Sequence, residues 1–414
     1  MAHTQVSSVW APLRKLLTAL ALVAGIALWL IAARALWHSS VPGALRLPHL
    51  NPAQWFSQSF LRRSASYERF LDVDALLGTV VLLAVLVLYA KRGHTLMRES
   101  AAGRIGTGML LGMLGFGLVW LAEVPFALAA IWWERRHGVS HQGYLAALAE
   151  SWAGLGSKFL FVSLALAISM ALAGVLRSWW WTVAAPLFVG LALLSSFLSI
   201  YLIPATHPLH NPAELADFRA LARAEGVSGT RAYVQNVHRF TTAPNAEAVG
   251  FGPTRGVIVW DTLLDGRFSR GEIRVVLAHE LGHLAHHHTV KRVGWLALFL
   301  IPAAALIARL TRKRGGLSQP EAIPVALLVL VVLQVLVLPA QNLVSRREEA
   351  EADWASLQTT HDPIAARGLF RELATTSLSD PNPPAWSYLL DADHPTIMQR
   401  IAMTEAWQRQ KGGK

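Results

Sequence analysis

Residues 275–308 read VVLAHELGHLAHHHTVKRVGWLALFLIPAAALIA, so a His-Glu-Leu-Gly-His pattern stands directly before a long apolar run. On a helix, positions i and i+4 lie on one face, and the imidazoles of His279 and His283 can therefore both reach one Zn²⁺. Glu280 would flank the metal without binding it and could take a proton from a bound water. The alternative is a solvated His/Glu face that holds no metal. Residues 275–278 argue against it, because they make the helix amphipathic.

The composition indicates a membrane protein. Hydrophobic residues make up 53% of the 414 residues and charged residues only 15%, and the mean hydropathy is +0.38. A soluble domain carries about 25% charged residues, so this chain has too few charges to cover a surface that faces water. The same composition excludes a disordered chain.

The chain contains no cysteine and has a formal net charge of +11, with an isoelectric point of about 10.4. Without thiolates, any metal must be held by His, Asp or Glu. Lys and Arg beside membrane helices bind anionic lipid head groups, and no nucleic-acid-binding motif accompanies the charge. We therefore expect membrane lipid, and not nucleic acid, as a partner.

Apolar runs predict seven membrane-spanning helices, because about 20 apolar residues are needed to cross a bilayer. The runs cover residues 16–37, 73–90, 105–133, 157–176, 178–204, 293–308 and 322–343. Glu123 lies inside the third run, where an ionisable group faces a partner or a wet cavity unless it marks the end of the helix.

These runs divide the chain into four parts. Residues 1–206 form an N-terminal membrane domain of five spans, and residues 293–343 form a transmembrane hairpin. The polar stretches 207–292 and 344–414 are two halves of a catalytic domain. Neither half is large enough to bury a core of its own, so we expect the two to pack on each other.

The first polar stretch is predicted to mix helices and strands. Asn211 followed by Pro212 is typical of a helix start, and Gly252–Pro253 separates two short strand candidates. The predicted helices cover residues 211–224 and 269–289, and the predicted strands cover residues 231–235, 248–251 and 256–260.

Two histidines need a third metal ligand. A histidine six residues after His283 is excluded, because position 289 is Thr. The acids that follow the last apolar run, Glu348, Glu349 and Glu351, are all available, and charge alone leaves the choice among them open.

The pattern Ser-Arg-x-x-Glu-x-x-Ala-Asp at residues 345–353, together with the His-Glu-Leu-Gly-His helix and the apolar runs, resembles the type I CAAX prenyl protease family. These proteins are integral-membrane zinc endopeptidases, and the heat-shock membrane metalloproteases are related to them. The resemblance implies that Glu349 is the third ligand, that Asp353 orients a ligand imidazole, and that Arg346 lies close by. For this segment alone, the alternative is a charged helix end beside the membrane.

Two more segments near the first motif resemble the same family. Residues 245–252 and 257–264 are similar to its Asn-Ala-x-x-x-Gly-Phe edge strand and its Asp-Thr-Leu-Leu segment. Such an edge can bind an extended peptide as an added strand. The resemblance implies that substrate binds at Asn245, Val249, Gly250 and Phe251. The alternative is an ordinary hairpin, and Glu247 departs from the family, which often has an aromatic residue there.

Residues 394–400 read HPTIMQR and resemble the terminal His-Pro-x-x-x-x-Arg of the family. The resemblance implies that His394 supports the tetrahedral intermediate and that Arg400 ties the C-terminal helix to the site. An ordinary helix start with Pro395 in its first turn is the alternative. The histidines that follow the first motif, His286, His287 and His288, receive no defined role from these patterns.

Together these features predict a multi-span α-helical membrane protein, in which about seven transmembrane helices enclose a chamber and carry a small α+β gluzincin-like zinc protease domain. The predicted function is a zinc metalloendopeptidase with one Zn²⁺ per chain, which cleaves membrane-associated or prenylated-type peptides. The Ala-, Leu- and Arg-rich composition favours a bacterial inner membrane. Lys and Arg are balanced between the two sides, so an active site that faces the cytoplasm is implied by the resemblance alone.

Two other functions compete with this prediction. An intramembrane site-2-type protease would carry its His-Glu-x-x-His inside a span, but residues 279–288 are too polar to face lipid. A non-enzymatic transporter or metal-binding chaperone would hold cargo with the same histidines and would not need Glu280. No pattern determines the oligomeric state, and a monomer suffices for the predicted site.

Overall fold

The computed structural model describes residues 3–95 and 103–412. Within these residues, seven helices are long and apolar enough to cross a membrane. They are α1 (His3–Leu36), α2 (Gln58–Arg92), α3 (Gly103–His137), α4 (Tyr144–Leu176), α5 (Trp181–Leu202), α8 (His288–Leu310) and α9 (Ile323–Thr360). The seven predicted spans are thus confirmed, and the fold is that of a multi-span helical membrane protein.

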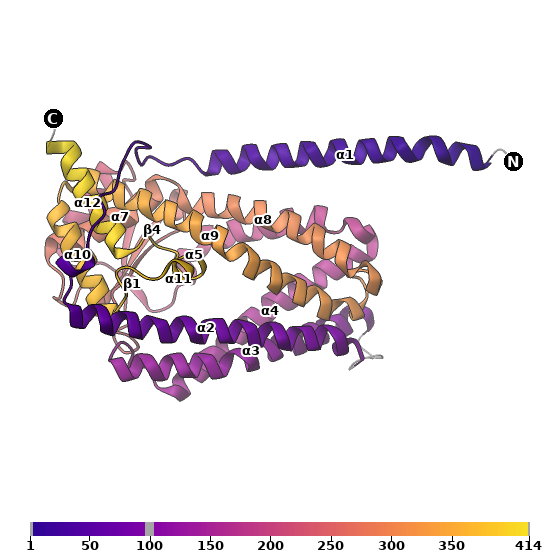
Figure 1. The fold of residues 1–414 in the computed structure, drawn as a ribbon, viewed down its shortest axis with the longest axis horizontal. Coiled ribbons are helices and arrows are strands. Elements are labelled where there is room, and N and C mark those ends of the chain that lie inside the picture. Colours follow the sequence, from indigo (N-terminus) through magenta and orange to yellow (C-terminus); the bar gives the residue numbers. More distant parts are fainter. Residues whose placement is uncertain (1–2, 96–102, 413–414) are drawn as a thin grey trace.

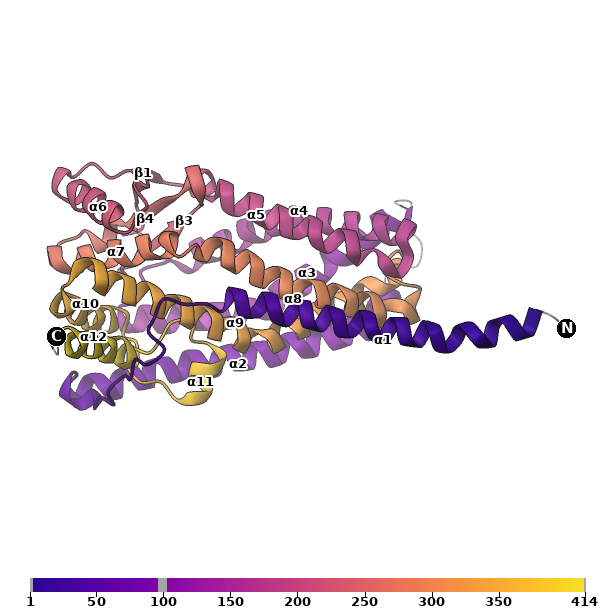
Figure 2. The same ribbon diagram turned by 90° about the horizontal axis from the view of Figure 1, so that it is seen from above.

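α2, α3, α4, α5, α8 and α9 run alongside one another, whereas α1 lies outside them and its N-terminal part extends beyond their end (Figures 1 and 2). The strands and shorter helices gather at the other end. α1 contacts α8 from outside, where the Trp29 indole donates a hydrogen bond to the Leu298 carbonyl at 2.9 Å. Apolar side chains cover the outer surface; Leu160 and Val175 of α4, for example, are 70% and 81% exposed. A surface of this kind requires bilayer hydrocarbon around it, because water would make it a site of aggregation.

A four-stranded sheet and five helices form the polar part. The strands are β1 (Thr206–Pro208), β2 (Arg231–Gln235), β3 (Ala246–Val249) and β4 (Gly256–Trp260), in the order β1-β2-β4-β3. β2 and β4 are parallel, whereas the two outer pairs are antiparallel. The helices are α6 (Pro212–Ala224), α7 (Arg270–Ala285), α10 (Pro363–Ser377), α11 (Ala385–Leu390) and α12 (Ile397–Gly412).

One hydrophobic core joins residues from both polar stretches. Phe218 of α6 and Leu277 of α7 pack in the same cluster as Leu357 of α9, Phe370 of α10 and Ile401 of α12. Burial of each such side chain contributes roughly 1.5–3 kcal/mol, so the polar stretches stabilise each other and neither is a separate unit in this fold.

Local sequence signals explain where the helices of the polar part begin. The Asn211 side chain accepts a hydrogen bond from the Ala213 amide at 3.0 Å and caps α6. Ser269 and Glu272 form a reciprocal capping box at the start of α7. The predicted helix over 211–224 and the predicted strands over 231–235 and 256–260 are confirmed.

The single helix predicted over 269–289 is wrong. α7 ends at Ala285, and α8 begins three residues later at His288. Between them His287 has a φ of 57°, a left-handed conformation that ends one helix and turns the chain before the next. Residues 283–290 contain no Gly or Pro to mark this turn, which is why the sequence pattern did not show it.

The strand predicted over 248–251 lies two residues earlier, at Ala246–Val249. Gly250 has a φ of 70°, and its amide donates a hydrogen bond to the Ser199 hydroxyl of α5 at 3.1 Å. The Phe251 ring packs edge-on against Phe197 of α5, with ring centroids 5.4 Å apart. A left-handed glycine therefore turns the chain out of the sheet and onto a membrane helix.

α9 connects the membrane to the polar part without a break. Its 38 residues begin in the bundle and end in the polar core, beside α7. The two helices approach closely at Gly282, where an added Cβ would lie only 3.1 Å from the Cβ of Ala355. Because the residues at this crossing are small, α7, which carries the His-Glu-Leu-Gly-His motif, lies directly on the half of α9 that carries the acidic residues.

Candidate active site

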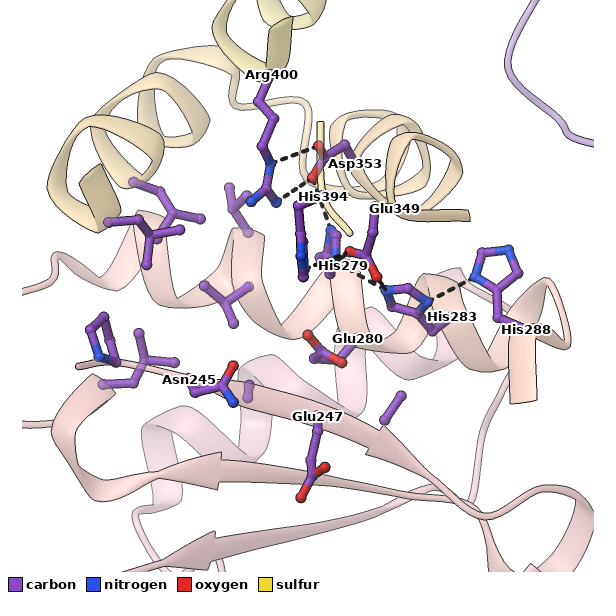
Figure 3. Close-up of a pocket in the computed structure, with 18 of the residues that line it drawn as sticks. Asn245, Glu247, His279, Glu280, His283, His288, Glu349, Asp353, His394 and Arg400 are labelled. Atoms are coloured by element: carbon purple, nitrogen blue, oxygen red, sulfur yellow. Dashed lines mark hydrogen bonds and ion pairs between the residues drawn. The ribbon is translucent and has the colours of Figure 1, made fainter. Parts of the chain in front are cut away.

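His279 and His283 of α7 and Glu349 of α9 bring their side-chain donors together in the buried contact between the two helices (Figure 3). The two Nε2 atoms are 3.1 Å apart, and Glu349 Oε2 lies 3.1 Å from Nε2 of His279. Glu349 Oε1 lies 3.5 Å from Nε2 of His283. A tetrahedral ion with bonds of about 2.1 Å spaces its ligands about 3.4 Å apart, so this donor set fits a metal ion.

Glu348 and Glu351, the two acids near Glu349 on α9, have different partners from Glu349. Glu348 pairs with Arg292 at 2.8 Å, and Glu351 pairs with His288 at 3.0 Å. Of the three, only Glu349 reaches both motif histidines. Successive positions on a helix point in different directions, which is why Glu349 reaches the motif histidines and Glu348 reaches only Arg292.

Asp353 lies one turn after Glu349 and accepts a hydrogen bond from Nδ1 of His279 at 2.9 Å. Arg400 of α12 donates two hydrogen bonds to the same carboxylate, at 2.7 and 2.8 Å, and lies over the Phe370 ring at 4.3 Å. This bidentate pair is buried and links α12 to α9. Asp353 is therefore placed to orient the imidazole of His279, with Arg400 fixing the carboxylate.

Arg346 does not contact His279, His283 or Glu349. Its guanidinium donates to the carbonyls of Tyr388 and Ala392 at 2.8 and 2.5 Å and lies over the Tyr388 ring. Those carbonyls belong to the segment that leads to His394, so Arg346 holds this segment rather than His279, His283 or Glu349.

His394 lies beside the carboxylate of Glu349, with its Nε2 3.3 Å from Oε2. Its Nδ1 lies 2.7 Å from Asp393, and half of its side chain is exposed. Arg292, which no sequence pattern pointed to, places a guanidinium nitrogen 3.3 Å from Glu349 Oε1. Two groups that can donate hydrogen bonds therefore flank the carboxylate of Glu349.

A cavity of about 350 Å³ opens in front of this cluster. Its lining includes Glu280, Arg292, His394 and Asn245. Glu280 is buried, and its burial raises its pKa to about 7, although His279 and the backbone of Ala248 act in the opposite direction. A carboxylate whose pKa lies near neutral pH is well matched to proton transfer.

The side of the cavity that faces α7 is formed by the outer edge of β3. Asn245 accepts a hydrogen bond from the Trp260 amide at 2.9 Å, and the register pairs Ala246 with Val259 and Ala248 with Val257. In an antiparallel ladder the hydrogen-bonded and non-hydrogen-bonded pairs alternate. The backbone groups of Ala246 and Ala248 therefore point away from β4, to the side where the cavity lies.

Of the four predicted substrate residues, only Asn245 lines the cavity. Val249, Gly250 and Phe251 lie outside the lining, because the chain turns onto α5 there. The part of the chain at β3 that lines the cavity is Asn245–Ala248, which precedes the predicted binding residues Val249–Phe251. The alternation of β3 could have pointed to Ala246 and Ala248, had the end of the strand at Val249 been foreseen.

Glu123 lies at a different place, in a cavity of about 590 Å³ between α2, α3, α4 and α9. Glu150 and Gln334 line the same cavity. The span is not interrupted at Glu123, since α3 continues to His137. A largely apolar cavity with a few polar side chains thus exists among the membrane helices, apart from the cluster of His279, His283 and Glu349.

Comparison with known proteins adds family relationships to this geometry. Residues 211–408 match peptidase family M48. A protease HtpX homolog of Acidiphilium cryptum is 30% identical over 213 residues, which cover 46% of this chain and 72% of that protein. The uncharacterized metalloprotease YhfN of Bacillus subtilis is 29% identical over 244 residues, or 55% of this chain and 57% of that protein. A CAAX prenyl protease 1 homolog of Oryza sativa subsp. japonica is 29% identical over 39% of this chain and 40% of its own.

The fold is shared with a solved structure. The crystal structure of S. mikatae Ste24p matches with a TM-score of 0.67 and 17% sequence identity, over 91% of this chain and 96% of that one. Membrane helices that deliver a His-Glu-x-x-His helix and a later glutamate to one point define the class of integral-membrane metallopeptidases. The chain belongs to peptidase family M48.

Proposed function

We propose that this protein is an integral-membrane zinc metalloendopeptidase that hydrolyses peptide bonds of membrane-associated or prenylated-type peptides, with one Zn²⁺ per chain. The observation that carries the proposal is the convergence of His279, His283 and Glu349 beside Glu280 in one cavity. Relatives named as proteases support the enzyme over a transporter or chaperone, and one of them is a CAAX prenyl protease 1 homolog. Its name supports the prenylated-type substrate class.

When bound, Zn²⁺ supplies a Lewis acid that polarises the scissile carbonyl and the attacking water. Glu280 accepts the proton of that water and transfers it to the leaving amine. With both ring nitrogens protonated, His394 donates a hydrogen bond from Nδ1 to Asp393 and one from Nε2 to the oxygen on which negative charge develops. Asp353 keeps the proton of His279 on Nδ1, so that Nε2 is free to bind the metal.

The substrate binds as an added strand along β3. Ala246 offers an amide and a carbonyl at the outer edge, and the Ala248 amide lies next to Glu280. An extended peptide that pairs with this edge passes between β3 and α7, which places its backbone in front of the metal ligands. Because the contacts are mainly to backbone, side-chain selectivity is loose.

Ala246→Pro tests this binding mode, because proline removes the outward amide without removing a hydrogen bond to β4. We expect kcat/KM for a peptide to fall about fivefold to tenfold, the equivalent of one hydrogen bond of about 1 kcal/mol, with zinc content unchanged. Ala246→Ser, which keeps the amide, is the matched control and should cleave like the wild type. Equal activity of the two variants, or a bound peptide seen elsewhere in a crystal structure, would contradict the binding mode.

The catalytic part comprises residues 207–292 and 344–414, and the membrane part comprises residues 1–206 and 293–343. We place the protein in a bacterial inner membrane with its active site facing the cytoplasm. The bacterial relatives support the bacterial inner membrane. The resemblance to the prenyl protease family supports an active site that faces the cytoplasm.

Metal removal and restoration test the function as a whole. Treatment of the detergent-solubilised full chain with 1,10-phenanthroline is expected to abolish cleavage of a fluorogenic peptide, and one equivalent of Zn²⁺ is expected to restore it. The readouts are the initial rate and the zinc content of the same samples. Metal-free protein that still cleaves would refute the metallopeptidase, and protein that binds zinc but never cleaves would point to a transporter or chaperone.

A further inference from the structure

The second motif histidine has a buried partner that the reaction described above does not use. Nδ1 of His283 lies 2.8 Å from Nδ1 of His288, and Nε2 of His288 lies 3.0 Å from Oε2 of Glu351. His288 is 1% exposed and Glu351 is 2% exposed. The three side chains therefore form a continuous chain from the donor set into the contact between α8 and α9 (Figure 3 shows its His283–His288 link).

Proton positions along this chain are consistent with metal binding by His283. A histidine that binds a metal through Nε2 carries its proton on Nδ1. That proton is donated to Nδ1 of His288, whose own proton then lies on Nε2 and is donated to the carboxylate of Glu351. Every donor meets an acceptor, and both imidazoles stay neutral.

The outer end of the chain is held by the segment that follows α1. The Ser40 amide donates a hydrogen bond to Oε1 of Glu351. Lys291 lies 3.3 Å from Oε2 of Glu351 and donates another hydrogen bond to the His38 carbonyl at 3.3 Å. Residues from the start of the chain, from α8 and from α9 thus meet at one carboxylate.

The two motif histidines are supported differently. Nδ1 of His279 faces Asp353, which Arg400 of α12 anchors. Nδ1 of His283 faces His288, which begins α8 directly after the left-handed turn at His287. The break between α7 and α8 is therefore what directs the His288 ring back towards the motif helix.

We propose that His288 is a positioning residue for the metal ligand His283, that Glu351 orients His288, and that the segment after α1 completes this support through the Ser40 amide. The inference rests on the proposed metal site. It assigns the segment after α1 a part in metal binding, although this segment contributes no ligand.

Zinc affinity tests the proposal without reference to turnover. The full chain in detergent is prepared as wild type, His288→Leu, Glu351→Leu, Glu351→Gln and His287→Asn. The dissociation constant for Zn²⁺ is measured by competition with a chromophoric chelator, and the visible absorption of the Co²⁺-substituted protein reports the geometry around the ion. Melting temperatures of the metal-free proteins report the fold.

We expect His288→Leu and Glu351→Leu to bind Zn²⁺ about 10- to 100-fold more weakly, with altered Co²⁺ bands. Glu351→Gln keeps an oxygen that accepts the His288 proton and should recover most of the affinity. His287→Asn replaces an exposed neighbour, tolerates the left-handed conformation, and should match the wild type.

Wild-type affinity and Co²⁺ spectra in both leucine variants would overturn the inference. Equal losses in Glu351→Leu and Glu351→Gln would also overturn it, because a hydrogen-bond role predicts a difference. If His288→Leu does not fold, the two Glu351 variants decide. Failure of the wild type itself to bind Zn²⁺ would refute the proposed function instead, so the two failures are distinguishable.

Discussion

Replacement of Glu280 by glutamine is expected to abolish peptide hydrolysis and leave the fold and the bound metal unchanged. Glutamine has nearly the same shape as glutamate but cannot accept the proton of the attacking water, and Glu280 is not one of the three donors that converge. Loss of a general base lowers the rate about 10²- to 10⁴-fold. The measurement is kcat/KM for a fluorogenic peptide, with the zinc content of the same protein determined by mass spectrometry.

Glu247→Gln is the matched control. Glu247 is half-buried and lines the same cavity, but its carboxylate lies on the far side of β3 from His279, His283 and Glu349 (Figure 3). We expect it to retain most of its activity. Wild-type turnover by zinc-loaded Glu280→Gln would refute the general-base role.

If Glu280 is the general base, peptides that co-purify with Glu280→Gln from its native membrane would identify the substrate.

Glu349→Ala is expected to lose the metal, and all activity with it. A catalytic zinc site needs three protein ligands, and removal of the carboxylate leaves only two imidazoles. The zinc content of the purified protein should fall from about one equivalent to near zero, and added Zn²⁺ should not restore cleavage. Equilibrium dialysis followed by metal analysis measures the first effect, and the peptide assay measures the second.

Glu348→Ala is the matched control for Glu349→Ala. Glu348 is the adjacent acid on α9 and is equally buried, but it pairs with Arg292 and does not reach the motif histidines. Its loss should cost little stability, because Arg292 is half-exposed and keeps Glu349 as a partner, while zinc binding persists. Retention of zinc by Glu349→Ala together with its loss from Glu348→Ala would show that the ligand is wrongly assigned.

The sequence alone predicted the seven membrane helices, because each depends only on the length and polarity of one continuous run. It predicted that His279 and His283 share a helix face, because a spacing of four residues places them one turn apart. It predicted the start of α6 from Asn211 and Pro212, since capping acts between near neighbours. Each of these features is encoded within about one turn or one span of chain.

The choice among Glu348, Glu349 and Glu351 could not be made from charge and needed either the resemblance or the structure. The three acids lie within four residues of one another, so the local sequence does not distinguish them. Only the packing of α9 on α7 decides which one faces the histidines. That packing depends on the close approach of Gly282 and Ala355, which are distant in the chain. No local pattern reports such a contact.

The tertiary structure alone decided the features that a periodic pattern conceals. The left-handed turn at His287 occurs without a Gly or Pro to mark it and directs His288 to His283. Gly250 ends β3 because Ser199 and Phe197 of α5 hold the chain beyond it, and this moves the open edge to Ala246 and Ala248. In each case the conformation is set by contacts with an element far away in the sequence, and the free energy of those contacts outweighs local preference.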